Sequence, residues 1–259
     1  MPMCPAIKNE RRNVLHLWCA YPDDLIDEAA ARSGEALLDA EERVRRQRFR
    51  SEHKQREFLT AHALARVALS HHRSVTPRDW RFRTNANGKP ALDPDCGLRF
   101  NLSHSAGLAV CLVADAAVEV GVDVEAITRA SEIAAVAHKV FSKAERAQLD
   151  ALLEAEKRDR CVSLWTLKEA YVKARGVGMG STLPLRDISF LFDEAGAVRL
   201  DVDQSLDEHA ARWDFRLLDC AGHRIALAAE GTSGWDLEMW EARPVSAPPK
   251  KIVPQREGR

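Results

Sequence analysis

The most regular pattern of hydrophobic and polar positions runs from Val118 to Glu125, where valines alternate with Glu119, Gly121, Asp123 and Glu125. A two-residue period of β-branched side chains is typical of a half-buried strand. We therefore expect the valines in the core and Asp123 and Glu125 on the opposite face, where Gly121 leaves room for a ligand or another backbone. The two carboxylates repel each other unless a divalent cation, a basic side chain or a shared proton lies between them. An ordinary solvated strand face is the alternative interpretation.

Two segments have apolar residues at helical spacing. Residues 57–66 consist of good helix formers, and residues 163–175 predict a second helix. The buried stripe of the second helix is predicted to contain Leu164, Leu167, Tyr171 and Ala174. Glu169 and Lys173 share another side of this helix, with Lys168 beside them. These charges indicate either an ordinary ion pair four residues apart or a site with a third carboxylate and two ammonium groups.

The remaining pattern divides the chain into two comparable halves. Strands are also predicted at 14–20, 80–83, 108–114, 188–192, 198–202, 212–219 and 224–229, and helices from residue 25, at 131–140 and from residue 142. Because each half runs from a strand through helices to further strands, we expect two similar α+β lobes. The predicted boundaries are a flexible N-terminus at 1–13, an N-terminal lobe at 14–116, a C-terminal lobe at 117–241 and a disordered, basic, proline-rich tail at 242–259.

Composition narrows the class of protein. The chain has 259 residues, of which 46% are hydrophobic and 30% charged, so it can bury a full core. Its formal net charge of -1 argues against general nucleic-acid binding and leaves room only for local anion sites. The absence of an apolar run of signal-peptide or membrane-span length predicts a cytoplasmic protein without a membrane partner. The 6 cysteines lack C-x-x-C spacing and are expected to be reduced and mostly buried.

Candidate anion-binding groups precede the acidic strand. The segment 43–56 is rich in arginine, whose forked guanidinium matches phosphate oxygens, although a solvated helix face would explain it equally well. Lys89 is expected in a turn between Gly88 and Pro90. The run from Ser103 to Ser105 is expected on a loop before the strand at 108–114, where its hydroxyls and imidazole could donate to phosphate. A catalytic triad is disfavoured, because adjacent Ser and His side chains cannot form its geometry with each other.

Several motifs, taken in order, resemble those of the 4′-phosphopantetheinyl transferases of the Sfp type. They are Gly88-Lys89-Pro90, Asn101-Leu102-Ser103-His104-Ser105, Gly121-Val122-Asp123-Val124-Glu125, Phe141-Ser142 and Trp165-x-x-Lys168-Glu169-Ala170-x-x-x-Lys173. The resemblance covers roughly residues 14 to 230. It implies a pseudo-dimer of two similar α+β lobes, the 4′-phosphopantetheinyl transferase fold, with the active site in the cleft between the lobes.

The resemblance also implies roles for individual residues. It makes Asp123, Glu125 and Glu169 ligands of magnesium, with manganese as a possible substitute, and it places Lys168 and Lys173 near the pyrophosphate and adenylate of coenzyme A. Contacts with coenzyme A phosphates are implied for Arg45, Arg56, Lys89, Ser103 and His104. Two departures from the family pattern are Glu42 and Glu57, which stand where basic residues are expected.

The implied activity is magnesium-dependent transfer of 4′-phosphopantetheine from coenzyme A to a serine of an apo acyl or peptidyl carrier protein, with release of 3′,5′-ADP. Glu169 is the expected proton acceptor, and Lys168 and Lys173 are expected to stabilise the leaving diphosphate. A monomer is expected, because one chain is long enough for both lobes. The alternatives are a magnesium-dependent nucleotide phosphohydrolase and a binding module that holds a carrier protein or a nucleotide without turnover.

Overall fold

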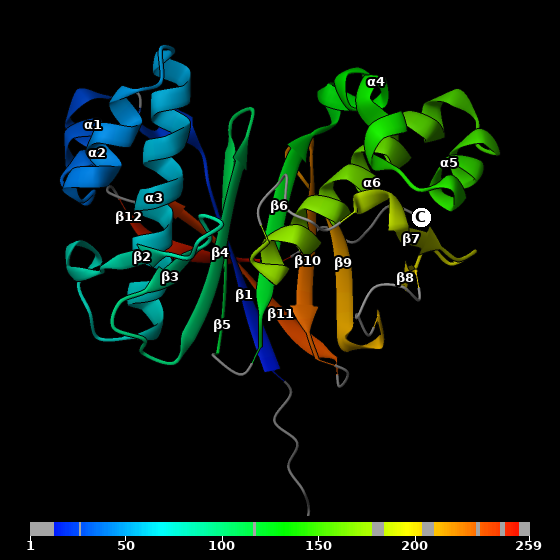
Figure 1. Cartoon of the computed structure of the whole chain (residues 1–259). Helices are drawn as coiled ribbons and strands as arrows, with labels where there is room; N and C mark the ends of the chain where they lie inside the picture. The colour runs from blue at the N-terminus through cyan, green and yellow to red at the C-terminus, as the bar shows by residue number, and fades with distance from the viewer. Residues whose placement is uncertain are drawn as a thin grey trace, which may run out of the picture.

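The computed structural model describes residues 13–25, 27–115, 118–177, 184–203, 210–231, 234–243 and 247–253. Two sheets stand side by side, each with helices against it (Figure 1). The larger sheet has the order β12-β11-β1-β5-β4, and the smaller sheet has the order β6-β10-β9. The predicted α+β fold class is therefore confirmed.

The first lobe is built on the larger sheet. Its strands are β1 (Asn13–Ala20), β4 (Leu98–Ser105), β5 (Leu108–Asp115), β11 (Trp235–Arg243) and β12 (Ala247–Ile252). Helix α3 (Glu52–His72) packs on this sheet, and helices α1 (Glu28–Glu35) and α2 (Ala40–Gln47) pack on α3. A short hairpin of β2 (Phe82–Thr84) and β3 (Pro90–Leu92) adjoins β4. Alternate residues of β1 and β5 pack against α3, so α3 covers one face of the sheet.

The second lobe is built on the smaller sheet. Its strands are β6 (Val120–Ala126), β9 (Trp213–Cys220) and β10 (His223–Glu230), and its helices are α4 (Ala130–Val140), α5 (Lys143–Asp150) and α6 (Glu154–Arg175). A separate ribbon is formed by β7 (Ile188–Phe192) and β8 (Val198–Val202). Helix α6 packs on β6 and β10, and the predicted stripe on α6 is buried in that core. Helix α6 ends at Gly176, whose φ of 64° is the left-handed cap that glycine favours.

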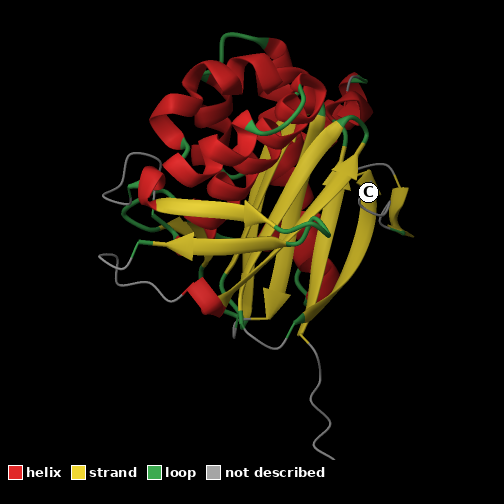
Figure 2. Cartoon of the chain, turned by 90° about the vertical axis from the view of Figure 1, so that its right-hand side faces the viewer, coloured by secondary structure: helices red, strands yellow, loops and turns green. Residues whose placement is uncertain are grey.

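The faces of the two sheets that point away from α3 and α6 form a shared core. Val120, Val122 and Val124 of β6 enter it with Leu15 and Leu17 of β1. Figure 2 shows the strands of both sheets running together beneath the helices. The other face of β6 is buried as well, which differs from the predicted half-buried strand. The physical reason is that α6 and β4 cover that face.

Gly121 lies directly against the backbone of α6. A Cβ atom at this position would lie 2.0 Å from the backbone oxygen of Ala170 and 2.5 Å from the backbone nitrogen of Ala174. The sequence predicted that either a ligand or another backbone would fill the space beside Gly121, and the backbone of α6 fills it. The missing side chain lets α6 sit directly on the acidic strand, which brings residues of α6 close to Asp123.

The C-terminal strands differ from the prediction. Strand β11 pairs in parallel with β1, so part of the segment assigned to the C-terminal lobe completes the sheet of the N-terminal lobe. Strand β12 pairs with β11, so the prediction of a disordered tail is wrong for residues 247–252. An edge strand tolerates prolines, and Lys251 bonds to Glu238 at 2.7 Å and lies over the ring of Trp240. The tail residues 244–246 and 254–259, and the N-terminal residues 1–12, lie outside the described part.

The hairpin of β4 and β5 corrects another local expectation. The run from Ser103 to Ser105 forms the end of β4 rather than a loop. Ala106 and Gly107, both with positive φ, then make the tight turn into β5. Side chains along the end of β4 therefore alternate between two faces, which a loop would not impose.

Two expectations drawn from composition concern the cysteines and membrane-spanning helices. The described cysteines, which are Cys19, Cys96, Cys111, Cys161 and Cys220, all have free thiols, as predicted. Among the described residues, no helix combines the length and the apolar character that crossing a membrane requires.

Candidate active site

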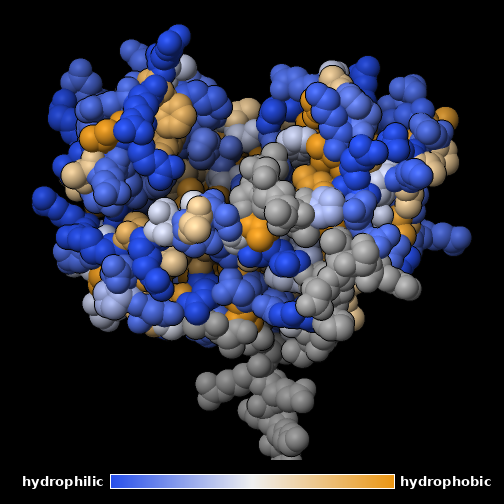
Figure 3. All heavy atoms as spheres, in the orientation of Figure 1, coloured by the Kyte–Doolittle hydropathy of each residue, from blue (hydrophilic) through white to orange (hydrophobic). Residues whose placement is uncertain are grey.

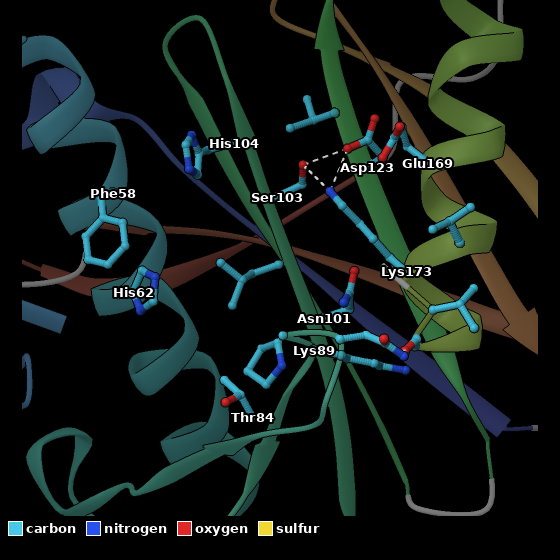
Figure 4. A pocket seen from close by; sticks show the side chains of 18 of the residues that line it. Phe58, His62, Thr84, Lys89, Asn101, Ser103, His104, Asp123, Glu169 and Lys173 are labelled. Atoms are coloured by element: carbon cyan, nitrogen blue, oxygen red, sulfur yellow. Dashed lines mark hydrogen bonds and ion pairs between the residues drawn. The ribbon is translucent and has the colours of Figure 1, made fainter. Parts of the chain in front are cut away.

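A cleft of about 520 Å³ runs across β4 and β6 between α3 and α6. Figure 3 shows the surface indented between the two lobes, and Figure 4 shows side chains from both lobes pointing into the cleft. The acids and bases that line it are Arg45, His62, Lys89, His104, Asp123, Glu125, Glu169 and Lys173. The cleft therefore contains most of the predicted site residues, although the sequence separates them by more than a hundred positions.

Asp123 lies at the centre of the polar contacts. Its Oδ1 atom accepts hydrogen bonds from Ser103 Oγ at 2.8 Å and from Lys173 Nζ at 2.7 Å (Figure 4). Its Oδ2 atom is buried and has no hydrogen-bond partner among the described residues. Burial raises the pKa of Asp123, and Lys173 opposes this effect. One carboxylate oxygen of Asp123 is thus free for a ligand.

Glu169 projects from α6 beside Asp123 (Figure 4). Burial raises the pKa of Glu169 to about 7, and the negative charges of Asp123 and Glu125 add to the effect. Lys173 is bonded to Asp123 and Arg129 to Glu125, so the carboxyl group of Glu169 adds negative charge to this group of acids. A positive ligand or a proton would relieve it.

Glu125 is held differently from the other two acids. Its Oε2 atom accepts hydrogen bonds from Arg129 Nη1 at 2.6 Å and Ser105 Oγ at 2.8 Å, and its Oε1 atom accepts one from Trp165 Nε1 at 3.2 Å. Both oxygens of Glu125 are therefore in use. Trp165 and Arg129 had no predicted role, although Trp165 belongs to the motif that contains Glu169.

The fit of the three acids to a metal ion can be judged from these contacts. In the described part of the chain, no group of three or more His, Cys, Asp and Glu side chains is arranged to hold a metal ion. Glu125 is bonded to Arg129 and Trp165. The unpartnered oxygen of Asp123 and the carboxyl group of Glu169 nevertheless provide the oxygen donors that a hard divalent cation prefers. The donor set therefore fits such a cation, with Glu125 adjacent.

Basic groups line the same cleft. Lys173 contacts Asp123, and Lys89 donates to the backbone oxygen of Ala174 at 2.8 Å, which joins the turn of one lobe to α6 of the other. Arg45 lies above the ring of Phe58, with its guanidinium carbon 5.7 Å from the ring centre. These cations line the same cleft as the acids and carry groups that can bind phosphate oxygens.

Lys168 is the main correction to the predicted site. Its side chain is almost fully buried in the second lobe, where Nζ donates to the backbone oxygens of Leu185 and Ile188 at 2.7 and 2.5 Å and lies 3.0 Å from Glu145 Oε2. Lys168 does not line the cleft. Adjacent residues of a helix are rotated by about 100°, so Lys168 points away when Glu169 points in.

The basic segment 43–56 is only partly at the cleft. Arg45 lines it, whereas Arg56 does not and lies 4.0 Å from Glu52 on the helix surface. Arg46 is bound to Glu35 at 2.9 Å. Arg45 thus lies where the predicted contact with coenzyme A could form, whereas the contact predicted for Arg56 stays a prediction that the lining of the cleft does not support.

The two acids that depart from the family pattern are buried. Glu42 accepts hydrogen bonds from His62 Nδ1 at 2.7 Å, if that nitrogen carries the proton, and from Arg66 Nη2 at 2.5 Å. Burial opposes ionisation of Glu42, but His62 and Arg66 outweigh it and lower its pKa to about 2. Glu42 therefore fastens α2 to α3. Glu57 is also fully buried and does not line the cleft.

Sequence reasoning missed the aromatic side of the cleft. Phe58 and His62 of α3 line it with stacked rings 4.0 Å apart. Their four-residue spacing on a predicted helix was the available signal. Asn101 belongs to one of the motifs, but no role was predicted for it. Its side chain accepts a hydrogen bond from the backbone N–H of Val122 at 2.9 Å, which joins β4 to β6.

Comparison with known proteins points to the family that the motifs resemble. The sequence model of the 4′-phosphopantetheinyl transferase superfamily matches residues 119–228. The 4′-phosphopantetheinyl transferase HetI of Nostoc sp. is 28% identical over 232 residues, which cover 87% of this chain and 91% of the relative. The 4′-phosphopantetheinyl transferase ffp of Bacillus subtilis is 30% identical over 169 residues, which cover 65% of this chain and 73% of the relative.

Among solved structures, a holo-(acyl-carrier-protein) synthase from Bacillus anthracis in complex with CoA (3′,5′-ADP) matches with a TM-score of 0.38 and 19% identity, over 44% of this chain and 96% of that one. The sequence relationships carry the assignment. The chain belongs to the 4′-phosphopantetheinyl transferase superfamily, as its motifs predicted, and is an enzyme of the 4′-phosphopantetheinyl transferase class.

Proposed function

We propose that this enzyme transfers the 4′-phosphopantetheine group of coenzyme A to a serine of an apo carrier protein, depends on magnesium and releases 3′,5′-ADP. The observation that carries the proposal is the meeting of Asp123, Glu169 and Lys173 in one cleft between two lobes. A diphosphate group carries negative charge on its oxygens and is bound through cations, which this arrangement of acids and ammonium groups supports.

In the proposed reaction, the serine oxygen attacks the β-phosphorus of coenzyme A and the bond from this phosphorus to the oxygen bridging to the α-phosphate breaks. Glu169 accepts the proton of the serine hydroxyl, a role supported by its raised pKa of about 7 and its place in the cleft. Lys173 stabilises the negative charge that develops on the departing 3′,5′-ADP, because it lines the cleft with its ammonium group beside Asp123. Lys168 has no part in this proposal.

Magnesium, when bound by Asp123 and Glu169 with Glu125 nearby, would neutralise charge on the diphosphate oxygens. Lys89, Ser103 and His104, with Arg45 towards α3, are proposed to hold the phosphates of coenzyme A, since all four line the cleft. A monomer is proposed as the active form, because every one of these side chains belongs to one chain.

The test is intact-mass measurement of an apo carrier protein mixed with coenzyme A, magnesium and this enzyme. Transfer adds about 340 Da to the carrier, the mass of the phosphopantetheine group. Glu169→Gln should reduce the rate by at least about a hundredfold, because general-base catalysis typically contributes that much. The exposed acid Glu154, at the start of the same helix, provides the matched control Glu154→Gln.

The outcomes separate the alternatives. Release of phosphate from coenzyme A or a nucleotide without a mass gain on any carrier would favour a phosphohydrolase. Metal-dependent binding of coenzyme A without turnover would favour a binding module. Near wild-type transfer by Glu169→Gln in the presence of magnesium would contradict the role given to Glu169, and undiminished transfer after removal of divalent cations would contradict the metal dependence.

A further inference from the structure

The tip of the β4–β5 hairpin stands between the two lobes and carries Ser103 and His104, which line the cleft, and Ser105, which contacts Glu125. Ser103 Oγ donates to Asp123, and Ser105 Oγ donates to Glu125, so the end of β4 is bonded to both acids of the neighbouring strand. His104 points to the other side, towards α3, and lines the cleft (Figure 4). The geometry of the cleft therefore depends on where this tip is held.

Glu57 of α3 contacts the tip from the first lobe. Its Oε1 atom accepts a hydrogen bond from the backbone N–H of Gly107 at 3.4 Å, and its Oε2 atom lies 3.6 Å from Nδ1 of His104. The same carboxylate is fixed by Lys54 at 2.7 Å and His53 at 3.1 Å, and its side chain has no exposed surface. A buried carboxylate bonded to an ammonium group remains ionised and attracts an imidazole N–H of His104.

His223 of β10 contacts the same tip from the second lobe. Its Nε2 atom lies 3.1 Å from the backbone oxygens of both Ser105 and Ala106, and its Nδ1 atom lies 2.8 Å from the backbone oxygen of Ala221. Carbonyl oxygens only accept hydrogen bonds, so His223 donates to the turn when Nε2 carries a proton, as in one neutral tautomer and in the imidazolium form. His223 is almost fully buried, and the contact spans 118 residues of sequence.

We propose that Glu57 and His223 are positioning residues for the transfer reaction, which hold the β4–β5 tip from opposite lobes and so set the places of Ser103, His104 and Ser105. Neither residue touches the reacting atoms; each acts through the tip. The inference rests on the proposed function for its kinetic consequence, because His104 must contact coenzyme A for the position of the tip to affect binding. It also explains why an acid stands at residue 57, where the resemblance led us to expect a basic residue.

The first test compares Glu57→Gln and His223→Phe with wild type. Hydrogen exchange of the tip amides should be faster in both variants, because each loses a contact that spans two elements. The KM for coenzyme A should rise by about tenfold, whereas kcat changes by less than about threefold. The control is Glu52→Gln, which removes a charge from an exposed position of the same helix and should leave exchange at the tip and KM unchanged.

The second test asks whether Glu57 acts through His104. In a double-mutant cycle, Glu57→Gln should raise the KM for coenzyme A by a smaller factor once His104 is alanine, because only the contact with Gly107 is then left to lose. Full additivity of the two changes would overturn that coupling. Unchanged exchange at the tip in both positioning variants would overturn the proposal, whatever the activity. Absence of carrier modification by the wild type would instead defeat the proposed function, and the exchange data would still decide whether the tip is held.

Discussion

Replacement of Lys168 by methionine separates the structural role seen here from the catalytic role that the motif suggested. The ammonium group of Lys168 has an acid and two carbonyl oxygens as partners, and the acid is Glu145, whose side chain is completely buried. Burial raises the pKa of Glu145 and lowers that of Lys168, and the attraction between the two groups opposes both shifts. Lys168→Met should therefore destabilise the second lobe.

The size of the effect follows from the loss of one member of a buried pair. Breaking such a pair and leaving the other charge in place costs about 3–5 kcal/mol. Methionine fills a similar volume, so a cavity adds little. For a chain of this length the loss corresponds to a decrease of about 10 °C in the melting temperature.

The assay is urea unfolding followed by tryptophan fluorescence, together with transfer kinetics at a temperature where the variant is folded. The matched control is Lys157→Met, the same substitution on the same helix at an ion pair whose acid is 85% exposed, and it should change the free energy of unfolding by less than about 1 kcal/mol. Adding Glu145→Gln to Lys168→Met should restore part of the stability, because no charge is then left unpaired.

The reasoning would be refuted by a variant with the unfolding midpoint of the wild type and no transfer activity. Such a result would place Lys168 in the reaction after all. The expected result is the reverse, with reduced stability and a kcat per folded molecule within about threefold of wild type.

Further predictions concern stability and its pH dependence. Gly121→Ala should lower the free energy of unfolding by about 3 kcal/mol in urea titrations, because the added Cβ would lie 2.0 Å from a backbone oxygen of α6; unchanged stability would mean that α6 can shift away. Burial, then two neighbouring imidazoles, lowers the pKa of His72 to about 4. The neutral form of His72 is thus favoured in the folded state. The free energy of unfolding should therefore fall as the pH decreases from about 6.5 to 4, and the loss should be on the order of 2 kcal/mol by about pH 5. His72→Phe should flatten this pH dependence. Hydrogen bonds from His62 and Arg66 outweigh burial and lower the pKa of Glu42 to about 2, so its stabilisation is present above about pH 4.5 and lost towards pH 2. Acid unfolding of Glu42→Gln should lack that loss, and an unaltered acid profile would contradict the assignment.

Periodicity and motifs were sufficient to predict many of the residues that line the cleft. The alternation along β6 predicted that Asp123 and Glu125 share a face, and the spacing on α6 predicted that Glu169 and Lys173 share another. Both predictions depend on the geometry of a single element, in which side-chain direction follows from the residue number. Which partner each acid meets was not available from that geometry, and Glu125 indeed faces Arg129 and Trp165.

Other residues could not be assigned from local pattern. Lys168 is adjacent to Glu169 in the motif, but the rotation of the helix buries it in the lobe core instead. Strand β12 looks like a disordered tail in the sequence because it is rich in proline and lysine. It is ordered here because β11 provides a strand for it to pair with.

The sequence by itself determined the family, the identity of the acidic strand and the helix that faces it, because those features depend on residue type and on the period of one element. Only the tertiary structure decided which charged groups meet. Contacts such as Glu57 with the hairpin tip, or Lys168 with Glu145, join segments that fold together through the packing of shared cores. A charge in a folded protein takes its role from the partners and the burial that this packing imposes, and neither is encoded in its immediate neighbours along the chain.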